Sequence, residues 1–214
     1  MKRICLSFAA VAMLAALPPP ASAAPGSSAA VYDAGRCIVA HDYNRALGLL
    51  LALPLDDQAA DLGGLRGTAA ASCAADIAGA SALTVRGALA QALFIRDFGS
   101  FGHDPRTNAH LINLNLPVQD DSRAGTRTLD LYRWGDCVVR NDPAATQRLL
   151  ASANGSPEEG AAMTELQTFM TPCMPFGVHL TVQLREARAV FAQAAYHAMY
   201  RYATGQLQTR SRPR

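Results

Sequence analysis

The residues best suited to chemistry in this chain of 214 residues are its cysteines and histidines, five of each. One cysteine lies in an N-terminal apolar segment, and the other four are Cys37, Cys73, Cys137 and Cys173. An even number of cysteines in an exported protein is typical of disulfide bonds, and four cysteines allow three pairings. A zinc or CxxC redox site is disfavoured, because no two cysteines lie close in the sequence. His41 follows Cys37 by four positions, but this pair alone falls short of a four-ligand site.

A second group of possible metal ligands consists of His103, Asp104 and His110. Two imidazoles and a carboxylate can hold a metal ion if the chain between them folds back. No ligand spacing supports a closed site, so we expect these to be exposed loop residues. The sequence contains no H-E-x-x-H metal motif, no G-x-S-x-G nucleophile motif and no glycine-rich phosphate loop. We therefore predict no catalytic residue, no resident metal and no cofactor.

Three large side chains are possible contacts with a partner or an anionic ligand: Arg86, Arg188 and Trp134. The two arginines stand at equivalent positions near the start of two expected helices. The alternative for them is a structural ion pair, or a contact with the C-terminal end of the preceding helix. Trp134 either presents an aromatic anchor to a partner or closes a small helical core. The sequence leaves both alternatives open.

The sequence repeats itself at a nearly constant offset. Cys-Ile-Val at 37–39 corresponds to Cys-Val-Val at 137–139, and a Leu-Leu pair follows each at the same distance, an offset of 100 positions. An arginine followed by Ala-Gln-Ala recurs at an offset of 102, and the two cysteines of each segment are 36 positions apart. These matches predict a tandem duplication in which each copy closes its own disulfide, Cys37–Cys73 and Cys137–Cys173. Each bridge would contribute about 4 kcal/mol in the chain-entropy model.

The second copy contains well-marked helix boundaries. Asp142 followed by Pro143 is a typical helix start, and Asn154-Gly155 is a typical helix end. Ser156 with Glu at 159 forms a capping box, which predicts a second helix whose apolar stripe ends at Cys173. Apolar spacing predicts a third helix over about residues 184–203, whose buried face would consist of Leu184, Ala187, Phe191, Ala195, Met199 and Tyr202.

The first copy follows the same plan with weaker signals. Asp42 is the expected cap of a short helix, Asp56-Asp57 begins a second, and Thr84 caps a third. Glycine, proline and aspartate between the copies predict a loop-rich linker. We therefore predict an all-α protein of two disulfide-linked three-helix units, divided into a first repeat (24–97), a linker (98–128), a second repeat (129–204) and a basic C-terminal tail (205–214).

The N-terminal residues predict export. Lys2 and Arg3 precede an apolar run, three prolines and Ala21-Ser22-Ala23, which together are typical of a signal peptide over residues 1–23. The apolar run is shorter than the roughly 20 residues of a membrane span, and we expect no transmembrane segment in the mature chain. Removal of the predicted signal peptide leaves 17 arginines, 17 acidic residues and no lysine in the mature chain. Nucleic-acid binding is therefore disfavoured, and we expect a periplasmic or secreted protein.

Two resemblances bear on function. Cys-Val-Val-Arg-x-Asp-Pro-Ala-Ala at 137–145, with the later Leu-Leu pair, Cys173 and Arg188, resembles uncharacterised exported proteins of alphaproteobacteria, of the sphingomonad type. That resemblance spans both repeats and implies no activity. Cys-Met-Pro-Phe-Gly-Val at 173–178, followed by Gln-Leu at 183–184, is similar to small periplasmic immunity proteins of the Rap/Tai type. The first copy lacks this turn.

Three functions follow as hypotheses. The first is a non-catalytic binding or scaffold protein of the cell envelope, whose partner is an envelope protein or ligand. The second is an immunity-like inhibitor that neutralises a toxin. The third, less favoured, is a hydrolase or metal protein that uses the linker histidines. The absence of catalytic motifs in the sequence favours the first of these.

Overall fold

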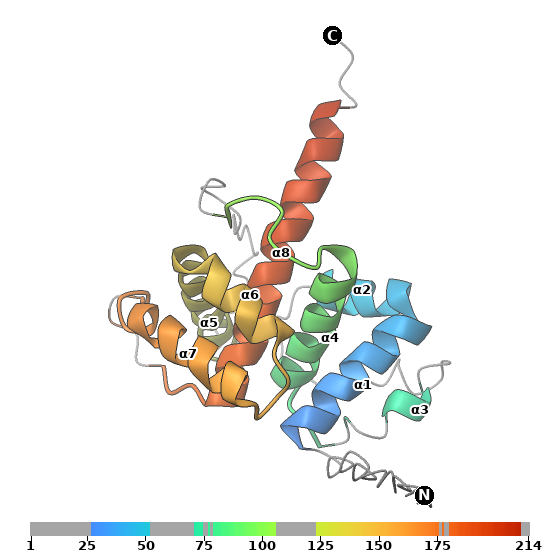
Figure 1. Ribbon diagram of the computed structural model, residues 1–214, viewed down its shortest axis with the longest axis horizontal. Helices are drawn as coiled ribbons and strands as arrows, with labels where there is room; N and C mark the ends of the chain where they lie inside the picture. Colours follow the sequence, from blue (N-terminus) through green and yellow to red (C-terminus); the bar gives the residue numbers. More distant parts are fainter. Residues whose placement is uncertain are drawn as a thin grey trace, which may run out of the picture.

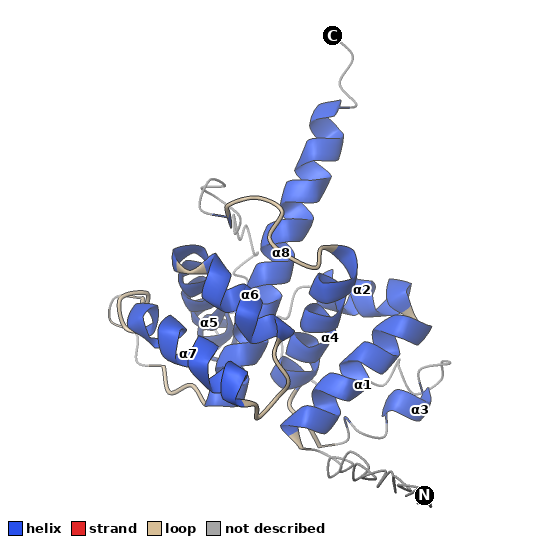
Figure 2. Ribbon diagram, in the orientation of Figure 1, coloured by secondary structure: helices blue, strands red, loops and turns tan. Residues whose placement is uncertain are grey.

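The computed structural model describes residues 27–51, 71–74, 77, 79–105, 123–175, 177 and 180–210. Within these ranges all regular secondary structure is helical, as Figure 2 shows, so the fold is all-α as predicted. Several predictions concern residues outside the described ranges: the signal peptide, the helix start at Asp56-Asp57, His110 and the end of the basic tail.

The described helices divide into two groups around a shared C-terminal helix. Their bounds are α1 (Ser28–His41), α2 (Tyr43–Leu51), α3 (Ala71–Ala74), α4 (Ala82–Asp97), α5 (Arg123–Asn141), α6 (Pro143–Ala151), α7 (Pro157–Met170) and α8 (Leu184–Arg210). In Figure 1, α1 to α4 lie on one side of α8 and α5 to α7 on the other. Helix α8 packs against both α4 and α5, while α4 also packs against α1. The core therefore lies along the α4–α8 contact.

Helix starts in the second half form as the capping residues predict. The Asp142 side chain accepts a hydrogen bond from the Ala145 amide at 2.8 Å, and Pro143 occupies the first turn of α6. Ser156 Oγ accepts from the Glu159 amide at 3.2 Å, and the Glu159 carboxylate accepts in return from the Gly155 amide. These bonds satisfy amides that a helix leaves without an internal partner. Both predicted helix starts are confirmed.

The cap of α4 differs from the prediction. Ser81, not Thr84, precedes the helix, and its hydroxyl accepts a hydrogen bond from the Thr84 amide at 3.2 Å. Thr84 is therefore the third helical residue, and α4 begins three positions earlier than we predicted. The reason is that a serine hydroxyl satisfies the third amide of a helix as well as threonine does.

Each half contains a helix that the sequence reasoning did not predict. Helix α1 precedes Asp42 and carries Cys37, and α5 precedes Asp142 and carries Cys137. The second half thus has four helices instead of three. Helix α5 begins at Arg123, within the segment predicted as linker, and α8 continues to Arg210, within the predicted tail.

The disulfides have the predicted pairing. Cys37 is bonded to Cys73 and joins α1 to α3, with a Cα–Cα distance of 5.8 Å. Cys137 is bonded to Cys173 and joins the end of α5 to the turn after α7, with a Cα–Cα distance of 5.6 Å. Each bridge therefore connects the first helix of its half to a segment 36 positions later.

Helix α8 is buried on all sides over its central turns, not on one face as predicted. Tyr196, which we placed off the buried face, is 0% exposed, whereas Leu184, which we placed on it, is 55% exposed. The physical reason is the position of α8 between the two groups of helices, because a helix enclosed on every side has no solvent face. Its small residues allow this enclosure.

Close helix crossings occur at small residues on matching positions. Gly87 of α4 faces Ala189 of α8, and a Cβ added to Gly87 would lie closer than 3.0 Å to Ala189. The sequence offset of 102 makes these two residues equivalent. A pair of equivalent residues in contact is the arrangement that a two-fold relation between two copies would produce. The duplication itself stays a prediction.

Candidate functional site

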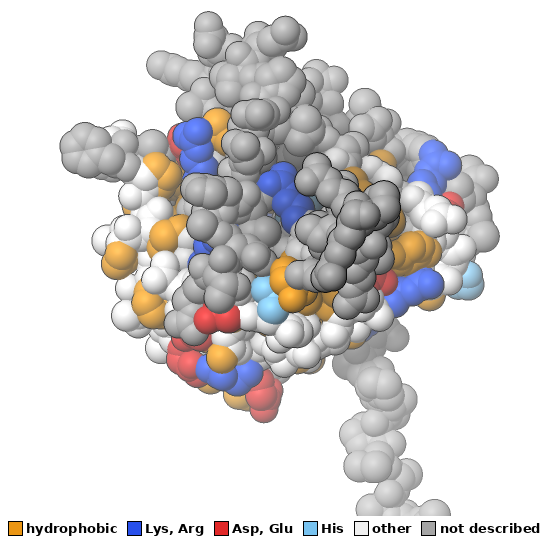
Figure 3. Space-filling model, turned by 90° about the horizontal axis from the view of Figure 1, so that it is seen from above, with side chains coloured by type: hydrophobic (Ala, Val, Ile, Leu, Met, Phe, Trp, Pro, Cys, Tyr) orange, Lys and Arg blue, Asp and Glu red, His pale blue; other side chains and the backbone are white. Residues whose placement is uncertain are grey.

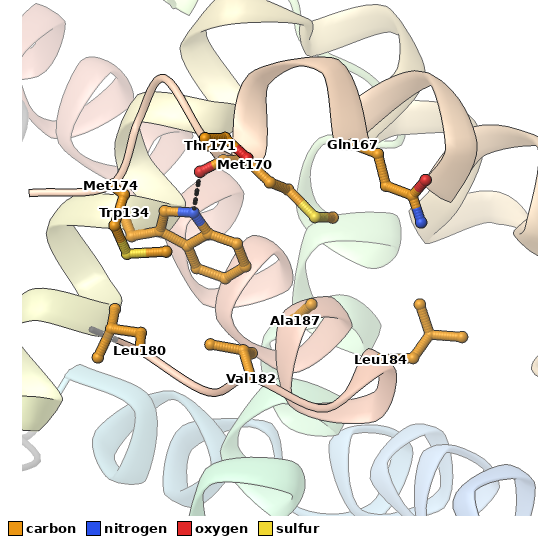
Figure 4. Close-up of a pocket in the computed structure, with 9 residues that line it drawn as sticks. All are labelled: Trp134, Gln167, Met170, Thr171, Met174, Leu180, Val182, Leu184 and Ala187. Atoms are coloured by element: carbon orange, nitrogen blue, oxygen red, sulfur yellow. Dashed lines mark hydrogen bonds between the residues drawn. The ribbon is translucent and has the colours of Figure 1, made fainter. Parts of the chain in front are cut away.

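An apolar pocket lies beside Trp134 in the second half of the protein. Its volume is about 350 Å³, and Figure 4 shows the indole ring of Trp134 forming one wall. Trp134 is 2% exposed, and its Nε1 donates a hydrogen bond to the Met170 carbonyl at 2.9 Å. The indole ring also contacts the ring of Phe191 of α8, with ring centroids 5.0 Å apart. These contacts fix the indole, so the pocket wall is rigid.

The rest of the pocket comes from three segments of the second half. Helix α7 and the turn after it supply one side, and the segment that leads into α8 supplies the other together with the first turn of α8 (Figure 4). The lining residues other than Trp134 are Gln167, Met170, Thr171, Met174, Leu180, Val182, Leu184 and Ala187. Methionine side chains are flexible and polarisable, so they adapt to apolar ligands of different shape. A volume of this size is within the range of small-molecule pockets.

The second disulfide holds this pocket together. Trp134 lies one turn before Cys137 on α5, and Met174 directly follows Cys173. The Cys137–Cys173 bond therefore connects the helix that carries the indole to the turn that supplies Met174 to the pocket. The first half has Ala34 at the position that corresponds to Trp134, so it cannot form the same wall.

The chemistry of the lining favours binding over catalysis. None of the residues that line the pocket carries a titratable or strongly nucleophilic side chain. Gln167 and Thr171 are its polar members, and both are exposed at the rim. General acid–base or nucleophilic catalysis requires a group that exchanges a proton or attacks the substrate. The pocket can therefore hold an apolar group and present neutral hydrogen-bonding groups at its opening.

Arg188, expected to contact a partner or an anion, lies in the interior. It is 1% exposed, and its guanidinium forms an ion pair with Glu159 at 2.6 Å. It also donates to the Ser152 carbonyl at 2.8 Å and to the Gln91 side chain at 3.1 Å. Ser152 is the C-terminal cap of α6, so Arg188 caps α6 and not α7, the helix that directly precedes α8. Arg188 therefore has a structural role, as an ion-pair partner and a helix cap, because a partner cannot reach it in this conformation.

Arg86 makes the corresponding contacts in the first half. Its guanidinium donates to the carbonyl oxygens of Leu49 and Leu50, at 2.6 and 2.9 Å. These carbonyls belong to the last turn of α2, where a helix leaves its C=O groups without internal partners. Both arginines therefore contact the C-terminal end of a helix, but it is the helix before the directly preceding one: α2 for Arg86 and α6 for Arg188.

The glutamines of the two Ala-Gln-Ala segments connect the halves. Gln91 on α4 donates to the Leu150 carbonyl of α6 at 2.8 Å. Gln193 on α8 accepts a hydrogen bond from the Tyr132 hydroxyl and donates to the Leu83 carbonyl of α4 at 3.5 Å. Both glutamines are buried. Their role in the structure is to satisfy polar groups in the core, which explains the recurrence of this residue type.

His103 and Asp104, the suggested metal ligands, do not form a ligand cluster in the described part of the chain. The His103 ring stacks on Tyr202, with centroids 3.5 Å apart, and partial burial lowers its pKa while nearby Asp104 opposes this effect. Across the described ranges, one group of three ligand-type side chains lies close together, and it consists of Cys37, His41 and Cys73. The structure thus brings together residues that the sequence separates by 36 positions.

His197 is a half-buried histidine of α8. Burial, together with the positive charges of Arg201 and Arg86, lowers the pKa of His197 to about 4. Burial also raises the pKa of Asp136, while its ion pair with Arg140, at 2.8 Å, acts in the opposite direction. His197 is therefore neutral at neutral pH. It belongs to the packing of the protein and not to the apolar pocket.

Basic and acidic side chains of the described residues lie near one another on the face that Figure 3 shows. Figure 3 shows blue and red side chains alternating along one edge of the described surface, with a histidine beside apolar side chains near the centre. Among the described residues, none of the helices combines the length and apolarity that crossing a bilayer requires.

Sequence reasoning missed most of the pocket. It singled out Trp134 but not the two methionines, Leu180 or Val182. One signal was available, because Leu180, Val182 and Leu184 alternate with polar residues just before a helix. Such alternation indicates an extended segment with one apolar side.

The chain matches no protein-family model, no curated protein and no solved structure.

Proposed function

We propose that this protein is an exported, non-catalytic binding protein whose ligand is a small apolar molecule with a neutral polar end. The apolar part would occupy the pocket beside Trp134, and the polar end would face Gln167 and Thr171 at the rim. The observation that carries this proposal is the lining of the pocket, which has a large apolar surface and no titratable side chain. Ligand pockets of this kind are mostly apolar with a few polar groups that orient the ligand.

Export to an oxidising compartment, such as the periplasm, is part of the same proposal. Two disulfides support it, because such bonds persist mainly in oxidising environments. The pocket depends on one of them, since Cys137–Cys173 connects two of its walls. A binding site built on a disulfide suits a protein that works outside the cytosol.

The single tryptophan of the chain reports on the pocket directly. The mature, oxidised protein is titrated with octanol, and octanoate serves as the charged counterpart. We expect a saturable change in tryptophan fluorescence with octanol and weaker binding of octanoate, because the lining offers no cation to pair with the carboxylate.

Two variants test where the ligand binds. Leu184 is 55% exposed at the pocket rim, and Leu184→Asp places a charge there. Ile95 is an apolar residue on α4 with a similar exposure of 44%, so Ile95→Asp is the matched control. We expect Leu184→Asp to weaken octanol binding at least about fivefold, which corresponds to roughly 1 kcal/mol of lost apolar contact. A linear, non-saturable response, or equal effects of the two variants, contradicts the proposal.

A further inference from the structure

The Cys37–Cys73 disulfide has a histidine beside it that belongs to the same helix. Cys37 and His41 are one turn apart on α1, so their side chains extend from the same face. One ligand atom each of Cys37, His41 and Cys73 lies within 4.8 Å of the other two. Cys73 is buried, Cys37 is half-buried and His41 is exposed. The three groups thus form a compact cluster that is open to solvent on the histidine side.

Two thiolates and an imidazole are a known type of zinc-binding set. Zinc binds sulfur at about 2.3 Å and nitrogen at about 2.0–2.1 Å, in tetrahedral geometry. Ligand atoms at these bond lengths are separated from each other by roughly 3.5 Å. The nitrogen of His41 lies within 4.8 Å of both sulfurs, so a modest side-chain movement brings it to this separation. The two sulfurs must move apart, because they are bonded to each other in the disulfide.

The second disulfide provides an internal comparison. Asn141 stands at the position that corresponds to His41, at the offset of 100. Its Nδ2 lies 3.6 Å from Cys137 Sγ and 3.5 Å from Cys173 Sγ, so it occupies the same place beside the sulfurs. A side-chain amide is a poor ligand for zinc, which prefers thiolate and imidazole. The first half therefore has three suitable ligands and the second half has two.

We propose that reduction of the Cys37–Cys73 disulfide creates a zinc site formed by Cys37, Cys73 and His41. In the reducing step a dithiol reductant donates two electrons and two protons, the S–S bond breaks, and the reductant becomes a disulfide. Zn²⁺ then displaces the two thiol protons and bonds to both sulfurs and to the imidazole. A water molecule from the solvent side supplies the fourth ligand.

The metal and the disulfide are alternative connections between α1 and α3. In the oxidised protein the covalent bond holds these helices together, and in the reduced protein the ion does so. Only the first half can make this exchange. The site is independent of the apolar pocket, which lies in the other half of the chain.

Cobalt is the spectroscopic probe for this site. The mature protein is reduced with a phosphine, which takes oxygen from water, becomes a phosphine oxide and contributes no thiol ligand. Co²⁺ is then added without air, and Zn²⁺ is used to displace it. We expect a thiolate-to-cobalt charge-transfer band that saturates at one ion per reduced chain. The oxidised chain should show no such band.

Exchanging the residues beside the two disulfides gives the decisive comparison. Mutation of a residue that only hydrogen-bonds to a zinc ligand costs about 10–100-fold in metal affinity. Because His41 is a direct ligand, His41→Asn should weaken metal binding at least about tenfold. Asn141→His should give the reduced chain a second binding equivalent. Equal affinity of the parent and His41→Asn, or no gain in Asn141→His, contradicts the proposal. Circular dichroism of each reduced variant reports its helix content, and cobalt binding that is the same in unfolded chains also contradicts it.

Discussion

Replacing Gly87 with alanine should force apart the two central helices. A Cβ at position 87 would lie closer than 3.0 Å to both Cβ and Cα of Ala189. These atoms are part of the α8 backbone or attached directly to it, so no side-chain rotation relieves the overlap. Helices α4 and α8 must therefore separate, and each belongs to a different half of the protein. The whole core along this contact would then loosen.

The size of the effect follows from two opposing contributions. An alanine in place of glycine within an open helix stabilises the protein by about 0.5–1 kcal/mol. Overpacking a close-packed interior costs about 1–3 kcal/mol, and a contact between backbones belongs at the upper end of that range. We expect Gly87→Ala to lower the free energy of unfolding by about 2 kcal/mol. At about 2–4 °C per kcal/mol for a protein of this size, the Tm falls by about 4–8 °C.

A second glycine supplies the control with the opposite sign. Gly160 lies within α7, and a Cβ added there meets no other atom within 4 Å. Gly160→Ala should therefore raise the free energy of unfolding by up to about 1 kcal/mol. Urea and thermal unfolding of the oxidised mature protein, followed by circular dichroism, measure both variants. If Gly87→Ala is as stable as the parent while Gly160→Ala is stabilised, the argument from the helix crossing is refuted.

Two further predictions concern buried charge. Arg188→Met leaves the Glu159 carboxylate without its 2.6 Å partner in the interior and should cost about 3–5 kcal/mol in urea unfolding. Arg148→Met, which breaks an ion pair whose side chains are 54% and 48% exposed, should cost less than about 1 kcal/mol, and similar losses would contradict this account. Burial lowers the pKa of His197 to about 4, below the value of about 6.5 in an unfolded chain. As the pH falls through this interval the unfolded chain binds the proton first, so the protein should lose about 3 kcal/mol of stability between pH 6.5 and 4. His197→Gln should reduce that pH dependence, and an unchanged slope would show that other groups cause it.

Local signals in the sequence predicted the parts of the fold that depend on near neighbours. Asp142 and Ser156 cap the helices that follow them, because a cap needs only a side chain and an amide three residues away. The regular spacing of the cysteines predicted the two disulfides. Helix α5 was missed because its first turn lies in a segment whose glycine content indicated a linker. The one-sided face predicted for α8 was wrong, because periodicity cannot show that a helix is enclosed on every side.

The sequence by itself determined the helical class, two helix starts and the pairing of the cysteines. The tertiary structure alone decided that Arg188 lies in the core, that Trp134 forms the wall of a pocket, and that His41 lies beside both sulfurs of the first disulfide. The physical reason is the range of the contacts. Caps and repeats are recorded in residues close in sequence or matched in position, whereas burial and ligand clusters arise from packing between helices that lie far apart along the chain.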